Sequence, residues 1–157
     1  MWFSRKQAAP IPPLAPNDAV GTTLATPALP GQITTKSRGD AAESAARAYL
    51  VQVGLKFIEA NYRTPGRGGG EIDLVMRASD GTLVFVEVRQ RSGASHGGAA
   101  ASISAVKQRR IVFAARHYLM RFASAPPCRF DVVLVDGVLS AQRAANIEWL
   151  PAAFDAS

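Results

Sequence analysis

Residues 70–91 read GEIDLVMRASDGTLVFVEVRQR, and this segment decides the fold. Two runs rich in Ile, Leu, Val and Phe, residues 71–77 and 82–89, are separated by Ser79-Asp80-Gly81. Short apolar runs joined by such a turn are typical of a β-hairpin. Each run also contains a carboxylate among residues suited to burial, Asp73 in the first and Glu87 in the second. A buried carboxylate is costly unless it is paired, hydrogen-bonded or bound to a metal, so these two residues are the first candidates for a site.

The length of the turn decides whether the two carboxylates meet. A two-residue turn at Asp80-Gly81 would pair Asp73 with Val88 and would place Asp73 and Glu87 on opposite faces of the hairpin. A three-residue loop with Gly81 in the left-handed conformation would pair Asp73 directly with Glu87. In that register the two like charges repel each other unless a cation lies between them. The sequence leaves both registers open.

Two carboxylates, a backbone carbonyl and water supply the oxygen ligands that Mg²⁺ prefers. Such an ion binds a phosphate oxygen and lowers the pKa of an attacking water, as phosphodiester hydrolysis requires. The alternative is that Asp73 and Glu87 cap strands or form ion pairs with Arg77, Arg89 or Arg129. Spacing alone weighs the two interpretations about evenly.

The other expected elements surround this hairpin. Apolar residues recur with helical spacing from Ala42 to Val53 and from Ile111 to Phe122, which predicts two helices, the second over about residues 104–122. Further strands are expected at about residues 56–62, 130–135 and 147–150. The order α-β-β-β-α-β-β predicts an α/β fold with a mixed sheet flanked by helices. Residues 1–37, which are interrupted by prolines, predict a disordered tail, and residues 38–157 the folded domain.

Basic residues are segregated along the chain. The formal net charge is +6, and every formal charge between Glu87 and Asp131 is positive. This distribution favours an anionic partner such as nucleic acid. Lys107 lies nearest the apolar stripe of the second helix, so it is the candidate for a phosphate close to the site. Backbone contacts farther along a duplex are assigned to Arg91, Arg110 and Arg121, although each such charge taken singly is more often a solubilising one.

Cysteine content and hydropathy indicate in which cellular compartment the protein is expected. Cys128 is the single cysteine, which excludes an intrachain disulfide and a cysteine metal cluster and indicates a reducing cytoplasm. Prolines interrupt the apolar stretches near the start of the chain, so we expect neither a secretory signal nor a membrane span.

Several blocks together resemble the YraN-type family of small bacterial proteins. Residues 70–75 and 84–91 are similar to its motifs G-E-I-D-L-I and F-V-E-V-K-x-R. Further similar blocks follow the family order at residues 41–46, 61–63, 107–110 and 129–133, so the similarity covers about residues 38–150. The family is similar to archaeal Holliday-junction resolvases and to the PD-(D/E)XK endonuclease superfamily. The resemblance therefore implies a restriction-endonuclease-like fold.

The resemblance also implies roles for individual residues. It makes Asp73 and Glu87 ligands of Mg²⁺ or Mn²⁺, adds the backbone carbonyl of Val88, and matches Glu43 to the helix-borne acid that often completes such sites. Without the family, an ion pair with Arg47 one helical turn away explains Glu43 equally well.

One position departs from the superfamily pattern. Arg89 stands where that pattern usually has Lys, and an arginine keeps the positive charge but cannot serve as a general base. It can still hold a scissile phosphate or stabilise charge in the transition state.

The expected function is that of a divalent-metal-dependent endonuclease acting on DNA, branched DNA included. Two alternatives stay open: a catalytically silent nucleic-acid-binding domain on the same fold, and a protein-interaction adaptor whose basic face meets an acidic partner. The sequence does not decide between DNA and RNA, or whether two chains pair into a homodimer as in resolvases.

Overall fold

The computed structural model describes residues 34–91, 103–137 and 145–156. In these ranges the elements are α1 (Thr35–Gln52), β1 (Lys56–Arg63), β2 (Glu71–Arg77), β3 (Leu83–Arg91), α2 (Ala105–Leu119), β4 (Cys128–Asp136) and β5 (Asn146–Phe154). The strands form one sheet in the order β1-β2-β3-β4-β5, in which β3 and β4 are parallel and the other pairs antiparallel. The expected α/β fold with a mixed sheet and the order α-β-β-β-α-β-β is therefore confirmed.

Two boundaries differ from the sequence-based expectation. α1 begins at Thr35, inside the last three residues of the expected tail, because Thr34 caps the helix by accepting a hydrogen bond from the Ser37 N–H at 3.1 Å. The rest of the expected tail, residues 1–33, lies outside the described residues. β5 spans nine residues, where a short strand at residues 147–150 was expected.

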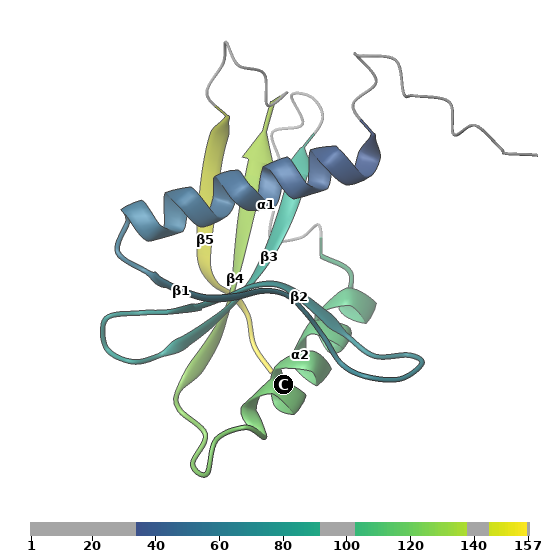
Figure 1. Ribbon diagram of the computed structural model, residues 1–157, viewed down its shortest axis with the longest axis vertical. Helices are drawn as coiled ribbons and strands as arrows, with labels where there is room; N and C mark the ends of the chain where they lie inside the picture. Colours follow the sequence, from purple (N-terminus) through teal and green to yellow (C-terminus); the bar gives the residue numbers. More distant parts are fainter. Residues whose placement is uncertain (1–33, 92–102, 138–144, 157) are drawn as a thin grey trace, which may run out of the picture. The chain divides into compact units, whose positions relative to one another are not determined.

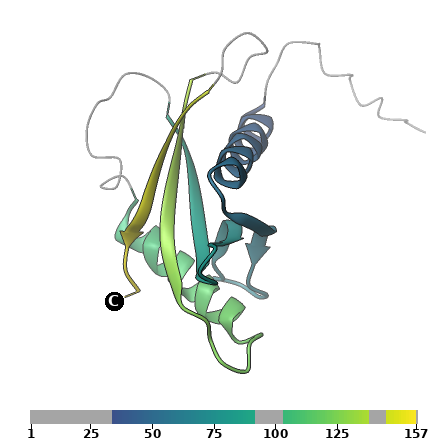
Figure 2. The same ribbon diagram turned by 90° about the vertical axis from the view of Figure 1, so that its left-hand side faces the viewer.

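The helices cover the two faces of the sheet. Figure 1 shows α1 crossing β3, β4 and β5, and Figure 2, turned by 90°, shows it to one side of these strands. α1 packs on Val84 and Val86 of β3, whereas α2 packs on the alternate residues Leu83 and Phe85. β3 is therefore buried on both faces, which is why its sequence is a continuous apolar run. The α2 crossover permits the parallel β3–β4 pair.

The hairpin between β2 and β3 has the three-residue register. Gly81 adopts φ +90°, and the Ala78 N–H donates to the Thr82 carbonyl at 2.9 Å. Leu74 pairs with Val86, so the next position along brings Asp73 opposite Glu87. The two-residue turn, which would have separated the carboxylates, is thereby excluded.

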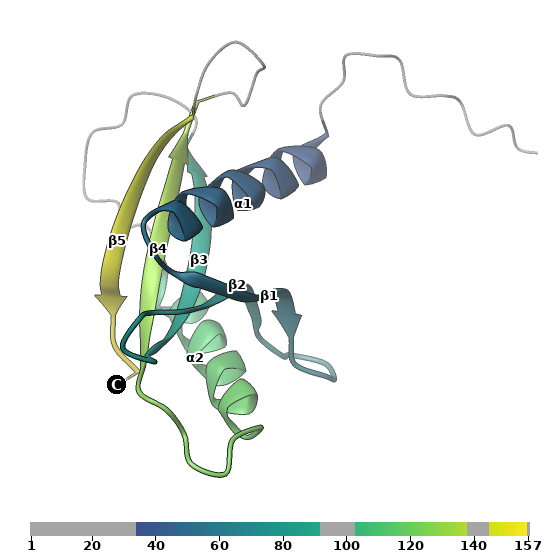
Figure 3. The same cartoon turned by 60° about the vertical axis from the view of Figure 1, so that its left-hand side comes forward.

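The side-chain alternation of β1 and β2 reverses next to this position. On β2, Leu74 packs in the α1 core and Ile72 in the α2 core, although residues two apart normally share a face. On β1, Ala60 and Tyr62 are divided in the same way. Asn61 lies between them at φ +53°, a left-handed conformation that Asn tolerates better than most residues. Figure 3 shows the twisted β1–β2 hairpin between the two helices.

A glycine brings α2 close to the start of β2. A Cβ at Gly70 would lie 1.9 Å from the carbonyl oxygen of Arg110 and 3.0 Å from the Cβ of Ala114. The Gly70 N–H also donates to Thr64 Oγ1 at 2.8 Å, which holds the preceding loop closed. Because glycine alone permits this approach, Gly70 allows the middle of α2 to lie beside the start of β2.

Candidate functional site

Asp73 and Glu87 lie side by side where β2 and β3 separate. The paired residues of the two strands end at Leu74 and Val86. Beyond that point the Val88 N–H donates to Asp73 Oδ2 at 2.8 Å. This backbone-to-side-chain hydrogen bond takes the place of a backbone hydrogen bond between the two strands. The two carboxyl groups are also within hydrogen-bonding contact of each other. The geometry therefore places two carboxyl groups next to each other between the strands.

Burial makes it difficult for this pair to carry two negative charges. Burial first, and the charge of Asp73 second, raise the pKa of Glu87 to about 7, against the opposing effect of Lys107. Burial also raises the pKa of Asp73, although the hydrogen bond from the Val88 N–H and the charge of Lys107 lower it. Two neighbouring carboxylates in this setting gain from a shared proton or a bound cation.

Glu87 carries a buried oxygen that accepts no hydrogen bond. Its side chain is 4% exposed, and Oε2 has no hydrogen-bond partner among the described residues. Nζ of Lys107, on α2, lies 3.3 Å from this oxygen, which is ion-pair distance without hydrogen-bond alignment. The Lys107 ammonium offsets part of the cost of burying this oxygen, and a bound cation or a donor group on a ligand would offset more of it.

The donor atoms fit a hard divalent cation. Mg²⁺ is typically bound through one or two carboxylates together with water and substrate phosphates. Asp73, Glu87 and the carbonyl of Val88 offer oxygen donors of that kind on adjacent strands. Within residues 34–91, 103–137 and 145–156, no three His, Cys, Asp or Glu side chains are arranged around one metal position. A metal site here would therefore depend on these two carboxylates.

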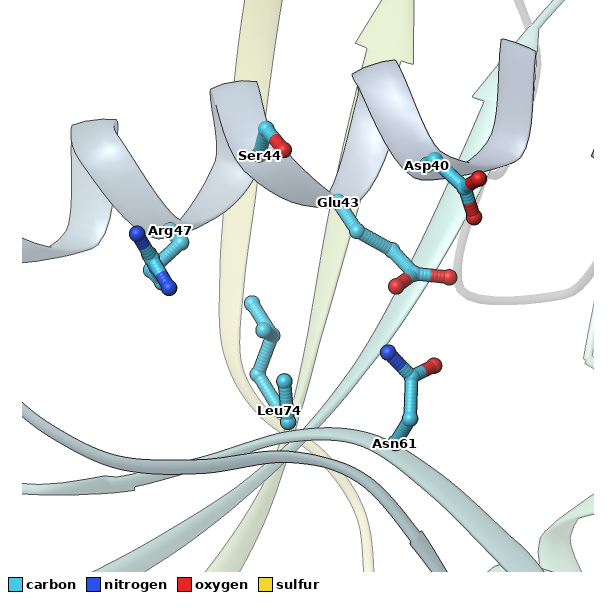
Figure 4. A pocket seen from close by; sticks show the side chains of 7 residues that line it. Asp40, Glu43, Ser44, Arg47, Asn61 and Leu74 are labelled. Atoms are coloured by element: carbon cyan, nitrogen blue, oxygen red, sulfur yellow. The ribbon is translucent and has the colours of Figure 1, made fainter. Parts of the chain in front are cut away.

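Glu43 approaches the pair from α1. It lines a cavity of about 220 Å³ together with Asp40, Arg47, Asn61 and other residues, and Figure 4 shows its carboxylate directed toward Asn61. Burial first, and the charge of Asp73 second, raise the pKa of Glu43, while a hydrogen bond with Asn61 lowers it. The alternative ion pair with Arg47 is not formed, because that guanidinium lies over the Phe57 ring, 4.6 Å from its centre.

Asn61 is a site residue that sequence reasoning missed. It lies opposite Asp73 on β1, since Ala60 pairs with Leu74 and Tyr62 with Ile72. Its side chain contacts Glu43, and its backbone is in the left-handed region. Residues held in strained conformations concentrate at functional sites. The available signal was an Asn in the middle of a strand, a position where that residue is disfavoured.

Three of the basic candidates lie near the carboxylates or on the adjacent helix. Lys107 contacts Glu87, as its place beside the apolar stripe had indicated. Arg89 follows Glu87 by two residues on β3, which places it on the same face, and it is half-buried. Arg110 is exposed on α2.

The other two basic candidates have partners within the fold. Nη1 of Arg91 lies 3.3 Å from Oε2 of Glu148 on β5. Nη1 of Arg121 lies 3.0 Å from Oε2 of Glu59, and its guanidinium lies 4.5 Å from the centre of the Tyr118 ring. A phosphate at either arginine would have to compete with a carboxylate. Their assignment to nucleic acid stays a prediction.

The stability of the metal-free protein should decrease between about pH 4.5 and pH 7. The pKa of Glu87 rises from 4.5 to about 7 on folding, so the folded state retains a proton that the unfolded state has released. The loss grows through that window and reaches at most about 3 kcal/mol near neutral pH. Glu87→Gln removes this contribution. Urea unfolding in EDTA at pH 5 and pH 8 should therefore show a smaller decrease for the variant, and equal decreases would contradict the assignment.

Comparison with known proteins identifies the family of this chain. The sequence model of the uncharacterised protein family UPF0102 matches residues 42–135. A UPF0102 protein of Polaromonas naphthalenivorans is 76% identical over 159 aligned positions that cover all of both chains. A UPF0102 protein of Albidiferax ferrireducens is 63% identical over 135 residues, 85% of this chain and 99% of its own. These names state no activity. Among the described helices, none is both long and apolar enough to cross a membrane.

Proposed function

The chain belongs to the uncharacterised protein family UPF0102, and we propose that it is a divalent-metal-dependent nuclease acting on DNA. It carries two neighbouring carboxylates beside a basic helix, Glu87 buried and Asp73 half-buried. The YraN-type resemblance noted in the sequence agrees with this family. The observation that carries the proposal is the pair Asp73 and Glu87, in which a buried Glu87 oxygen forms an ion pair with Lys107 but no well-aligned hydrogen bond among the described residues. Structural carboxylates of a folded core are normally satisfied by the protein itself.

Asp73 and Glu87 would hold Mg²⁺ or Mn²⁺, with the Val88 carbonyl as a further ligand. When bound, such an ion supplies Lewis-acid charge for a phosphate oxygen and lowers the pKa of an attacking water. Glu43, held by Asn61, adds a third carboxylate on the α1 side that can orient water or support a ligand.

Lys107 and Arg89 supply the positive charge of the site. Arg89 stays protonated, so it binds a phosphate and does not accept a proton. Lys107 contributes from α2 an ammonium group that lies 3.3 Å from Oε2 of Glu87. A phosphate that entered between these residues would find two cations and would weaken the Lys107–Glu87 ion pair.

A catalytically silent nucleic-acid-binding domain is the second candidate, and the Lys107–Glu87 contact favours it. The ammonium already offsets part of the charge that a metal ion would offset. On this interpretation the acids and Lys107 stabilise one another, and the basic residues of α2 carry the function.

Cleavage assays on several DNA structures separate the two candidates. The full chain is incubated with Mg²⁺ or Mn²⁺ and duplex, single-stranded, flapped or four-way DNA, and binding to the same substrates is measured in EDTA. Cleavage that requires the metal supports the nuclease. Binding without cleavage on any substrate supports the silent domain, and the absence of both would contradict both candidates.

A further inference from the structure

A groove on the outer side of α2 is not used by the carboxylate site. It has a volume of about 470 Å³ and is lined on α2 by Arg109, Val112, Phe113 and Arg116, and on the opposite wall by Asp155 and Ala156. Its size falls within the range of about 300–1,000 Å³ that is usual for ligand sites. We call it the α2 groove.

The lining of the α2 groove combines an exposed aromatic ring with arginines. Phe113 is 55% exposed, which is unusual for so large an apolar side chain. Arg109 and Arg116 lie four residues before it and three after it, so the three share one side of the helix over roughly 10 Å. Asp155 is the acidic residue of the lining, and Nη2 of Arg116 donates to the Ala156 carbonyl at 3.4 Å. The two arginines leave this surface positively charged.

The α2 groove and the carboxylate site lie on opposite sides of α2. The groove lining includes Ala105 and Gln108, which belong to the first turn and a half of α2. Lys107 lies between them in sequence but about half a turn away around the helix, on the side where it contacts Glu87. A chain-like ligand that reaches both sites would therefore have to pass around α2, which is about 10 Å thick.

We infer that the α2 groove binds an unpaired stretch of nucleic acid, with a base stacked on Phe113 and phosphates at Arg109 and Arg116. The inference rests on the proposed function, and it names the substrate class: nucleic acid that contains a single-stranded segment. Every base has an aromatic face, so one exposed ring serves any sequence. Bases inside a duplex are already stacked on their neighbours and cannot offer that face.

Binding measurements in EDTA test this inference. Fluorescence anisotropy with a labelled oligothymidylate should show that Phe113→Ala weakens binding by roughly 5- to 100-fold, the usual effect of losing one stacking partner. Phe113→Trp should retain the affinity, and affinity for a blunt duplex should change little in either variant. Met120→Ala is the matched control, because Met120 is 79% exposed and lies outside the groove lining. Arg109→Ala should weaken binding and reduce its salt dependence.

Two outcomes would overturn the inference. One is equal affinity of the wild-type protein and Phe113→Ala for oligothymidylate. The other is binding of polyglutamate, abolished by Phe113→Ala, without binding of oligothymidylate, which would assign the groove to an acidic protein segment. Since EDTA removes divalent metal, these results do not depend on cleavage. If the wild-type protein cleaves DNA but Phe113→Ala binds oligothymidylate as tightly as the wild type, the proposed function stands and this inference is wrong.

Discussion

Replacing Asp73 with Asn should lower metal-dependent cleavage by at least about 100-fold, because a charge that stabilises the reacting centre is lost. The fold should persist. Asn has nearly the same volume, and its side-chain oxygen can still accept the Val88 N–H that Asp73 Oδ2 accepts at 2.8 Å. Initial cleavage rates and circular dichroism of the two proteins measure the two effects separately.

Glu71→Gln is the matched control for Asp73→Asn. Glu71 lies two residues earlier on β2 and forms an ion pair with Arg63 at 2.9 Å. Its substitution removes the same charge near the site but no proposed ligand, so cleavage should change little. Binding of DNA in EDTA should hold or improve in Asp73→Asn, since one repulsion against phosphates has gone. Undiminished cleavage in both Asp73→Asn and Glu87→Gln would indicate a contaminating nuclease.

The meeting of Asp73 and Glu87 was one of two arrangements that local rules allowed. A glycine at the third position of Ser79-Asp80-Gly81 permits the left-handed conformation that a three-residue hairpin loop requires. Strand geometry then carries that register along the hairpin to the carboxylates. The sequence left two registers open because Asp80-Gly81 is equally suited to a two-residue turn. The observed hydrogen bond from Ala78 to Thr82 decides between them.

The environment of Glu43 was not predictable from spacing. It depends on the reversal at Asn61, where the backbone leaves the extended conformation in the middle of β1. A period of two residues contains no sign of such a reversal, since Ala60 and Tyr62 would be assigned to one face. The helix alone offered Arg47 as the partner of Glu43. In the folded protein Arg47 lies over Phe57 and Asn61 takes its place.

The surroundings of the basic residues were predictable only in part. Lys107 was assigned to the site because its angle on α2 brings it near the buried stripe, and it does contact Glu87. Arg121 was assigned to nucleic acid from its charge and its place on one flank of the second helix, and Arg91 from its charge and its place at the end of the motif-like strand. Their partners Glu148 and Glu59 lie on β5 and β1, far away in sequence. Ion pairs between segments that are far apart in the sequence depend on tertiary packing, which charge segregation along a chain does not report.

Asp131 is a buried acid of the opposite kind from Glu87. It is fully buried, yet its carboxylate accepts hydrogen bonds from Arg129 Nε at 3.0 Å, from Trp149 Nε1 at 2.9 Å and from the Ala152 N–H at 2.9 Å. These bonds join β4 to β5 at a bulge, where Ala152 adopts φ +49°. The protein itself satisfies this carboxylate, so we assign it to structure.

Asp131→Ala should lower the free energy of unfolding by about 1–3 kcal/mol, because it leaves the half-buried Arg129 charge and the N–H groups of Trp149 and Ala152 without their acceptor. Asp131→Asn should also destabilise, since its NH₂ group would face other donors. Asp80→Asn, in the exposed hairpin turn, is the control and should have a much smaller effect. Urea unfolding in EDTA measures all three.

Cleavage per folded molecule should stay near the wild-type value in Asp131→Asn, because Asp131 contacts neither Asp73 nor Glu87. A stable Asp131→Ala protein with lost cleavage would instead place Asp131 in the site.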